Sequence, residues 1–298
     1  MPGSTRAFIT NNLRAPILFR PGSALDFISS RPLGGAGAII IVLMIAAALL
    51  ANFFAPYDPL ANNYGAMFEA PGVHHWLGTD SFGRDVLSRI LYGSRTALWV
   101  GFCSSLFGTS IGALIGVSCA YFGGKADLFM QRLMDILLSF PLIVLALVVV
   151  AVSGSGLWNV ILAITIPMIP RAALVVRSSA LALRQMLFVE AALTLGSSHW
   201  RVISRHMLPN VMAPYLIMLT AFLGQAILLE ASLSFLGLGV AEPTAAWGLM
   251  LRGAAVEFAE RAPWMALFPG LAISLAVFAF NVFGDSLRDA LDPKLRLP

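Results

Sequence analysis

The residues with the clearest chemical use form a short stretch between long apolar runs, in which Glu190, Ala191 and Ala192 are followed by a glycine at position 196. Residues from about 184 to 195 can form a short helix, and the two alanines leave its backbone open to close approach by another surface. Gly196 suits the left-handed position that ends such a helix, because it has no Cβ to clash. The chemistry that this pattern offers is recognition of a second surface.

The residues after Gly196 predict a second short helix. Ser197 or Ser198 can accept hydrogen bonds from the free amides of a helix that runs from about 199 to 207. Pro209 lacks the amide that a continuing helix would need. We therefore expect a compact helix-turn-helix that ends before Pro209.

A second polar stretch precedes the apolar interval that begins near residue 96. Gly78 and Gly83 permit turns, and the charged residues Asp80, Arg84, Asp85 and Arg89 include partners four residues apart, as on one face of a helix. A charged external loop held by these pairs is one interpretation, and a gating role is the other.

The elements that must position these residues are membrane helices. Of the 298 residues 58% are hydrophobic and 11% are charged, whereas about a quarter of a soluble domain is charged. About 20 apolar residues cross the hydrocarbon, and a charge at its centre costs at least about 2.5 kcal/mol. Charge-free intervals therefore mark the candidate spans; they cover residues 32–57, 96–124, 136–170, 207–229 and 262–284.

The third interval is too long for one crossing, and Gly154 and Gly156 supply a turn that splits it. One span is expected near 133–152 and another near 157–176. The prediction is an all-α integral membrane protein with six transmembrane helices.

The distribution of Lys and Arg orients the chain. With a cytoplasmic N-terminus, most of the 19 Lys and Arg residues lie on the inner side, as the positive-inside rule requires. Both termini and the stretch around Glu190 are then cytoplasmic. The basic pI of about 9.4 is explained by this topology and by anionic lipid, so no nucleic-acid partner is expected.

Several residues inside the expected spans carry groups that lipid does not solvate. These candidates for a translocation path are Asp135, Gln225, Glu230 and Asn281. Small residues also recur along the second span, and we expect them to pack against a partner subunit; they are Gly101, Gly108, Gly112 and Gly116. The four histidines are expected to be solvated loop residues, and no metal site is expected.

The stretch around Glu190 resembles the EAA loop of ABC importer permeases, which docks on a nucleotide-binding subunit. The match rests on Glu190-Ala191-Ala192, on Gly196 and on Leu208-Pro209-Asn210 at the family spacing. Thr194 departs from the family, which often has a basic residue there. The resemblance implies that the ATPase-docking residues are Glu190, Ala191, Ala192, Leu195, Gly196, Leu208 and Pro209.

The loop around Asp80 is similar to a signature of the C-type permease subunit in the dipeptide, oligopeptide and nickel importers. Its possible gating residues are Gly78, Thr79, Asp80, Gly83, Arg84 and Asp85. The resemblance implies a type I importer fold. It divides the chain into a cytoplasmic tail (1–32), a first transmembrane helix with its external loop (33–95), a core permease domain of five helices (96–290) with a coupling loop at 184–210, and a cytoplasmic tail (291–298).

The resemblance also implies the partners: a second, homologous permease in a heterodimer, two ABC ATPase subunits, an extracytoplasmic solute-binding protein and the bilayer of a bacterial inner membrane. This chain has no Gly-x-x-x-x-Gly-Lys-Ser/Thr loop, so ATP and Mg are expected on the partner ATPases and the chain itself is not expected to be an enzyme.

Peptides are the expected cargo, dipeptides or oligopeptides by family frequency. A permease for nickel or another chelate is the alternative, and a glutathione-like peptide is also open. An ion channel and a membrane-embedded enzyme are remote alternatives, because neither explains the spacing around Glu190.

Overall fold

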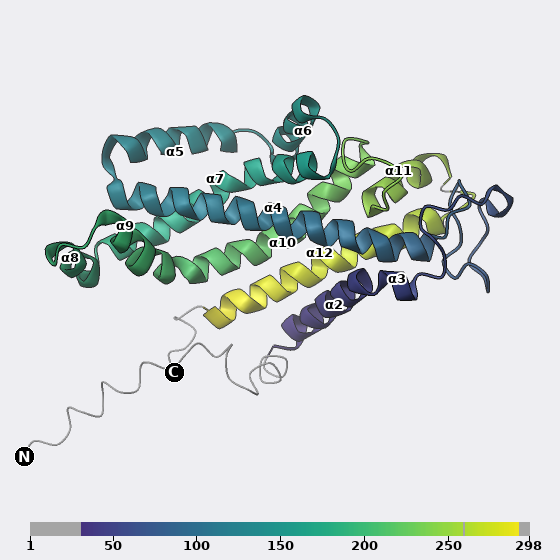
Figure 1. Cartoon of the computed structure of the whole chain (residues 1–298), viewed down its shortest axis with the longest axis horizontal. Coiled ribbons are helices and arrows are strands. Elements are labelled where there is room, and N and C mark those ends of the chain that lie inside the picture. The colour runs from purple at the N-terminus through teal and green to yellow at the C-terminus, as the bar shows by residue number, and fades with distance from the viewer. Residues whose placement is uncertain (1–30, 259, 292–298) are drawn as a thin grey trace, which may run out of the picture.

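The computed structural model describes residues 31–258 and 260–291, and nearly all of them are helical (Figure 1). Within these ranges the only extended pairing is a single antiparallel bridge between Thr79 and Asp85. The helices are α2 (Pro32–Leu49), α3 (Ala51–Phe54), η2 (Tyr64–Ala66), α4 (Val86–Phe122), α5 (Gly124–Leu138), α6 (Leu142–Ser153), α7 (Leu157–Arg184), α8 (Leu187–Thr194), α9 (His199–Val202), η3 (Ile203–Met207), η4 (Leu208–Val211), α10 (Met212–Phe235), α11 (Trp247–Glu257) and α12 (Trp264–Leu291).

Five helical stretches of the described residues are long and apolar enough to cross a membrane: α2, α4, α7, the run His199–Phe235 and α12. The pair α5 and α6 passes the same test jointly but bends by 91°. Counted as one broken crossing, this pair brings the total to the six that the sequence predicts.

The third predicted span is wrong in its form, because residues 133–152 do not make a continuous helix. α5 ends at Leu138, and α6 begins after Pro141. Proline has no amide to continue the hydrogen-bonding of α5, and it disfavours the helical conformation of the residue before it, Phe140. Hydropathy runs unbroken through the bend, so an apolar interval alone predicts one helix.

The second span is longer than predicted. α4 has 37 residues and begins at Val86 rather than near residue 96, with the Asp85 side chain accepting a hydrogen bond from the Ser88 amide as its cap. Arg89 lies inside this helix, yet its side chain is 3% exposed. A charge therefore does not mark the end of the helix, because the folded external loop covers it.

α4 and α7 pack closely through glycines. A Cβ on Gly112 would lie 2.5 Å from the Ala172 Cβ, and one on Gly116 would lie 2.5 Å from the Ala173 carbonyl oxygen. Gly108 faces Met168 in the same way, and Gly101 faces Ile227 of α10. The expectation that these glycines pack against a partner subunit is wrong, because helices of the same chain occupy that face.

A core of buried apolar residues joins α4, α6, α7 and α10, with Val100, Val150, Ile164 and Leu233 among its members. Figure 1 shows α2 and α12 on one side of α4, and α5 and α6 on the other. The long central helices therefore connect the external loop at one end of the molecule to α8 and α9 at the other.

The start of α2 and the end of α12 are tied together. The Arg31 guanidinium donates to the Ser286 carbonyl oxygen at 2.7 Å and lies 3.5 Å from the Asp289 carboxylate. The first turn of α2 and the last turn of α12 both point toward the end of the molecule that holds α8 (Figure 1). The predicted tails, 1–32 and 291–298, lie almost wholly outside the described residues.

The glycine contact between α4 and α7 makes a testable prediction. We expect Gly112→Val to lower the thermal unfolding midpoint of the purified protein, because overpacking costs about 1–3 kcal/mol. Gly270→Val is the matched control, since a Cβ at Gly270 of α12 meets nothing within 4 Å. Equal midpoints for the two variants would contradict the close packing.

Candidate functional site

The stretch around Glu190 folds into a hairpin of two short helices at one end of the molecule, shown at the left of Figure 1. Gly196 lies two residues after the end of α8 and has a φ of +76°. Its amide donates a hydrogen bond to the Leu193 carbonyl oxygen at 3.0 Å, and the Ser197 amide donates to the Ala192 carbonyl oxygen at 3.0 Å. This pair of bonds is a Schellman cap. The predicted left-handed glycine is confirmed, and it reverses the chain between the helices.

Helical structure covers the predicted residues 199–207, but it changes type along the way and does not end before Pro209. The Ser198 hydroxyl accepts a hydrogen bond from the Arg201 amide at 3.4 Å, and α9 ends at Val202. The chain then passes through the π-turn η3 and the 3-10 turn η4, with Pro209 in the first turn of η4, into α10. A proline is tolerated there because the first amides of a helical turn have no partner within that turn.

The inner face of the hairpin is seated on α4 and α7. Val189, Ala192, Val202 and Met207 are buried in one cluster with residues of both long helices, such as Val117 and Val176. The Tyr121 hydroxyl also lies 2.6 Å from His199 Nδ1. The hairpin is therefore packed directly against the ends of α4 and α7.

The outer face of the hairpin exposes large apolar side chains. Leu187 is 82% exposed, Leu195 is 86% exposed and Trp200 is 71% exposed. Of the predicted docking residues, Ala192 and Leu208 turn inward, whereas the others are exposed: Glu190, Ala191, Leu195, Gly196 and Pro209. Ala192 thus lies against helices of its own chain, and the docking role of these residues stays a prediction. The sequence analysis did not predict Leu187 and Trp200 as surface residues of the hairpin. Their helical spacing from the buried residues would have placed them on its exposed face.

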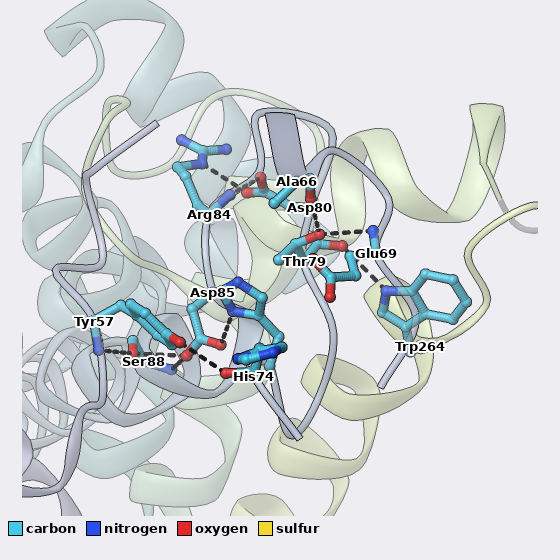
Figure 2. A network of polar contacts seen from close by, with 11 residues as sticks. Tyr57, Ala66, Glu69, His74, Thr79, Asp80, Arg84, Asp85, Ser88 and Trp264 are labelled. Atoms are coloured by element: carbon cyan, nitrogen blue, oxygen red, sulfur yellow. Dashed lines mark hydrogen bonds and ion pairs between the residues drawn. The ribbon is translucent and has the colours of Figure 1, made fainter. Parts of the chain in front are cut away.

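The external loop holds a buried polar network, shown in Figure 2. The Asp80 carboxylate accepts from the Phe82 and Arg84 amides at 2.8 and 2.9 Å and from Arg84 Nε at 2.6 Å. It also lies 3.7 Å from Arg89 Nε. One carboxylate thus contacts two backbone amides and two guanidinium groups, and it therefore holds the turn before α4 in shape.

Asp85 is the second centre of this network. Its carboxylate accepts from the Ser88 amide at 2.8 Å and the Ser88 hydroxyl at 2.7 Å, and it lies 3.0 Å from His75 Nδ1 (Figure 2). Of the two pairs predicted at a spacing of four residues, Asp80 and Arg84 form an ion pair, although within a turn. The other pair is wrong, because Asp85 caps α4 and Arg89 lies against Asp80 instead. His75 is 8% exposed, so the expectation of a solvated histidine fails there.

Thr79 and two glycines complete the loop. The Thr79 hydroxyl accepts from the Glu69 amide at 2.8 Å, and the Thr79 carbonyl oxygen accepts from Trp264 Nε1 of α12 at 3.1 Å (Figure 2). Gly78 and Gly83 have φ values of +76° and +70°, and a Cβ on either would collide with neighbouring atoms. The charges of this loop are buried, and the ion pair of Asp80 with Arg84 helps to hold it. The gating role of these residues stays a prediction.

The four polar residues proposed for a path do not converge. Asp135 is exposed on α5, 3.6 Å from Arg132, whereas Asn281 is exposed on α12, across α4 from α5 (Figure 1). Glu230 is 1% exposed and accepts from the Ser234 hydroxyl at 2.7 Å, and Gln225 is half-buried on α10. In this conformation Glu230 faces the interior of the bundle. Within residues 31–258 and 260–291 no group of three or more metal-ligating side chains gathers.

Two family models match parts of this chain. Residues 109–297 match the family model described as the binding-protein-dependent transport system inner membrane component. Residues 27–71 match the model of the N-terminal transmembrane domain of oligopeptide transport permease C. The two matches together cover the first span and everything from the last third of α4 through the hairpin to α12, and they leave out residues 72–108.

Curated relatives match over nearly their whole length. The chain is 44% identical over 264 residues to the glutathione transport system permease protein GsiD of Pectobacterium atrosepticum, with 88% of this chain and 87% of that protein covered. It is 42% identical over 261 residues to a protein of Brucella abortus described as a candidate peptide transport system permease, with 88% of each covered.

A solved structure shares the fold. The chain matches an inward-facing structure of the MetNI methionine ABC transporter with a TM-score of 0.55 and 19% sequence identity, covering 68% of this chain and 96% of that one. At this identity the match shows the architecture of a type I importer permease, and it confirms the predicted fold class.

The buried network around Asp80 predicts a large effect of one substitution. We expect Asp80→Asn to destabilise the external loop by about 3–5 kcal/mol, because it leaves the buried Arg84 and Arg89 without their carboxylate. Limited proteolysis of the loop measures this effect. Asp135→Asn is the control, since its pair with Arg132 is exposed and contributes at most about 1 kcal/mol. Equal cleavage of both variants would show that Asp80 does not hold the loop.

Proposed function

This chain belongs to the family of binding-protein-dependent transport system inner membrane components, and from that premise we propose that it carries peptides across a bacterial inner membrane as one of two homologous permease subunits. It is a multi-pass membrane permease of an ABC importer and not itself a catalytic enzyme. Beyond family membership, we propose the cargo, the membrane in which the protein lies and the composition of the complex.

The observation that carries the proposal is the two-faced hairpin of α8 and α9. Its inner face is buried against α4 and α7, and its outer face exposes Leu187, Leu195 and Trp200. Exposed large apolar side chains that cluster on one face mark a protein contact. On the cytoplasmic side of a permease, the partner that must be contacted is the subunit that hydrolyses ATP.

The proposed complex contains this chain, a second permease, two ABC ATPases and an extracytoplasmic solute-binding protein. ATP and Mg bind the ATPases. Their closure pushes on the hairpin, and the buried contacts of the hairpin pass the displacement to α4 and α7. The solute-binding protein delivers cargo to the external side, where the network of Asp80 and Asp85 holds the loop in shape.

Peptide is the proposed cargo because the relatives that cover 88% of this chain are described as permeases for peptides or glutathione. The match of residues 27–71 to an oligopeptide permease domain points the same way. Nickel or another chelate is the alternative, and glutathione-like peptides fall within the proposed class. Family membership removes the ion channel and the membrane-embedded enzyme.

Docking through the hairpin predicts a loss of ATPase binding on substitution of Leu195. Leu195→Ser should weaken co-purification of the ATPase subunits by more than tenfold, because burial of a leucine contributes about 1.5–3 kcal/mol. Val73→Ser is the matched control, since Val73 is 91% exposed on the external loop. A Leu195→Ser complex that keeps its ATPases and its uptake rate would refute the docking role.

Cargo is tested by uptake into cells with and without this chain, the partner subunits being present in both. We expect deletion of the chain to abolish uptake of labelled dipeptides or longer peptides by the cells. Glutathione uptake is measured separately. Nickel uptake should not change. Loss of nickel uptake alone would overturn the choice of peptides and leave the permease assignment intact.

A further inference from the structure

An open groove of about 580 Å³ lies between α2, α4, α10 and α12. Every residue that lines it is apolar except Arg95; the lining includes Ile41, Ile45, Leu98, Phe102 and Phe280. Leu49, at one end of it, is 72% exposed, and Ile45 is 42% exposed. The groove therefore opens on the side of the bundle, where apolar side chains of spanning helices face the hydrocarbon.

Arg95 stands at the external end of this groove. Its Nε donates to the Ala48 carbonyl oxygen, and one terminal nitrogen donates to the Leu49 carbonyl oxygen at 3.4 Å. The guanidinium also lies 4.7 Å from the centre of the Tyr92 ring. In the described residues no carboxylate forms an ion pair with Arg95, so a full positive charge is held in place at the end of α2.

A second cavity, of about 670 Å³, is lined by the same arginine. Its lining mixes apolar residues with polar ones, and the polar ones are Asn52, Tyr57, Asp58, Tyr92, Thr96 and Thr244. Trp99, which lines the groove one turn from Arg95, is 50% exposed. Aromatic side chains of this kind gather at the boundary between hydrocarbon and head groups. Arg95 thus stands between an apolar groove and a cavity that contains polar groups, as a head-group contact at the edge of one membrane leaflet does.

We propose that this groove is a phospholipid site, in which an acyl chain fills the apolar part and the phosphate of the head group pairs with Arg95. A guanidinium suits this role because its donors match phosphate oxygens and its charge does not titrate. The site takes a glycerophospholipid of the external leaflet, and it goes beyond the proposed transport function.

Arg95 favours a lipid over a helix of the second permease as the occupant. From Ile41 to Leu49 the groove follows α2 for about 12 Å at 1.5 Å per residue. An acyl chain can follow this apolar length while its phosphate reaches Arg95, whereas an apolar membrane helix leaves the guanidinium without an anion unless it carries a carboxylate there.

The test measures phospholipid retained by the assembled importer. The complex is extracted in mild detergent, washed and denatured, and the phospholipid released per chain is measured by mass spectrometry. Ile45→Trp fills the groove without touching Arg95, and Leu43→Trp is its control, because Leu43 lies on the same helix, is 63% exposed and does not line the groove. Both variants are compared at equal recovery of the intact complex by gel filtration.

We expect the wild type and Leu43→Trp to retain about one phospholipid per chain, and Ile45→Trp to retain at least fivefold less. Arg95→Gln should lose phospholipid to the same extent. Equal retention by Ile45→Trp and Leu43→Trp would overturn the site, as would a wild type that retains none. A cross-link from Ile45→Cys to the second permease would also overturn it, because it would show that a subunit covers the groove.

Discussion

The close contact between α4 and α7 is the constraint on which the rest of the structure depends. Glycines at 108, 112 and 116 let the backbones approach until a single added carbon would collide with Met168, Ala172 or Ala173. Between helices in lipid the hydrophobic effect adds little, so such van der Waals contact is a main source of association. It makes the two longest described helices around the core into one rigid pair.

The two ends of this pair carry the two polar elements of the chain. At one end Asp85 caps α4 and joins it to the external loop through His75 and Ser88. At the other end Tyr121 and the apolar residues around Val117 seat the hairpin of α8 and α9. In the proposed mechanism, a displacement at the hairpin reaches the external loop through these packed helices rather than through a flexible connection. A permease needs such a connection, because ATP is hydrolysed on the side opposite to cargo delivery.

The bend between α5 and α6 leaves irregular backbone inside an apolar stretch. At Ser139, Phe140 and Pro141 the backbone leaves the helix inside an apolar stretch, and these residues are exposed in the isolated chain. Irregular backbone is tolerated at membrane depth only where protein covers it or water reaches it. A lone chain thus leaves this backbone uncovered, which is consistent with the proposed assembly with a second permease.

Hydrophobicity and spacing along the chain by themselves determined the membrane class, the approximate positions of the spans, the helical hairpin and the left-handed Gly196. These are local properties, because apolar runs and a missing Cβ act whatever surrounds them. Tertiary structure alone decided that the glycines of α4 face α7, that Asp80 and Asp85 are buried centres of a network, that Ala192 turns inward and that Arg95 lines both a groove and a cavity. Each of these depends on which segments, distant in the chain, come to lie against one another, and no spacing within one segment carries that information.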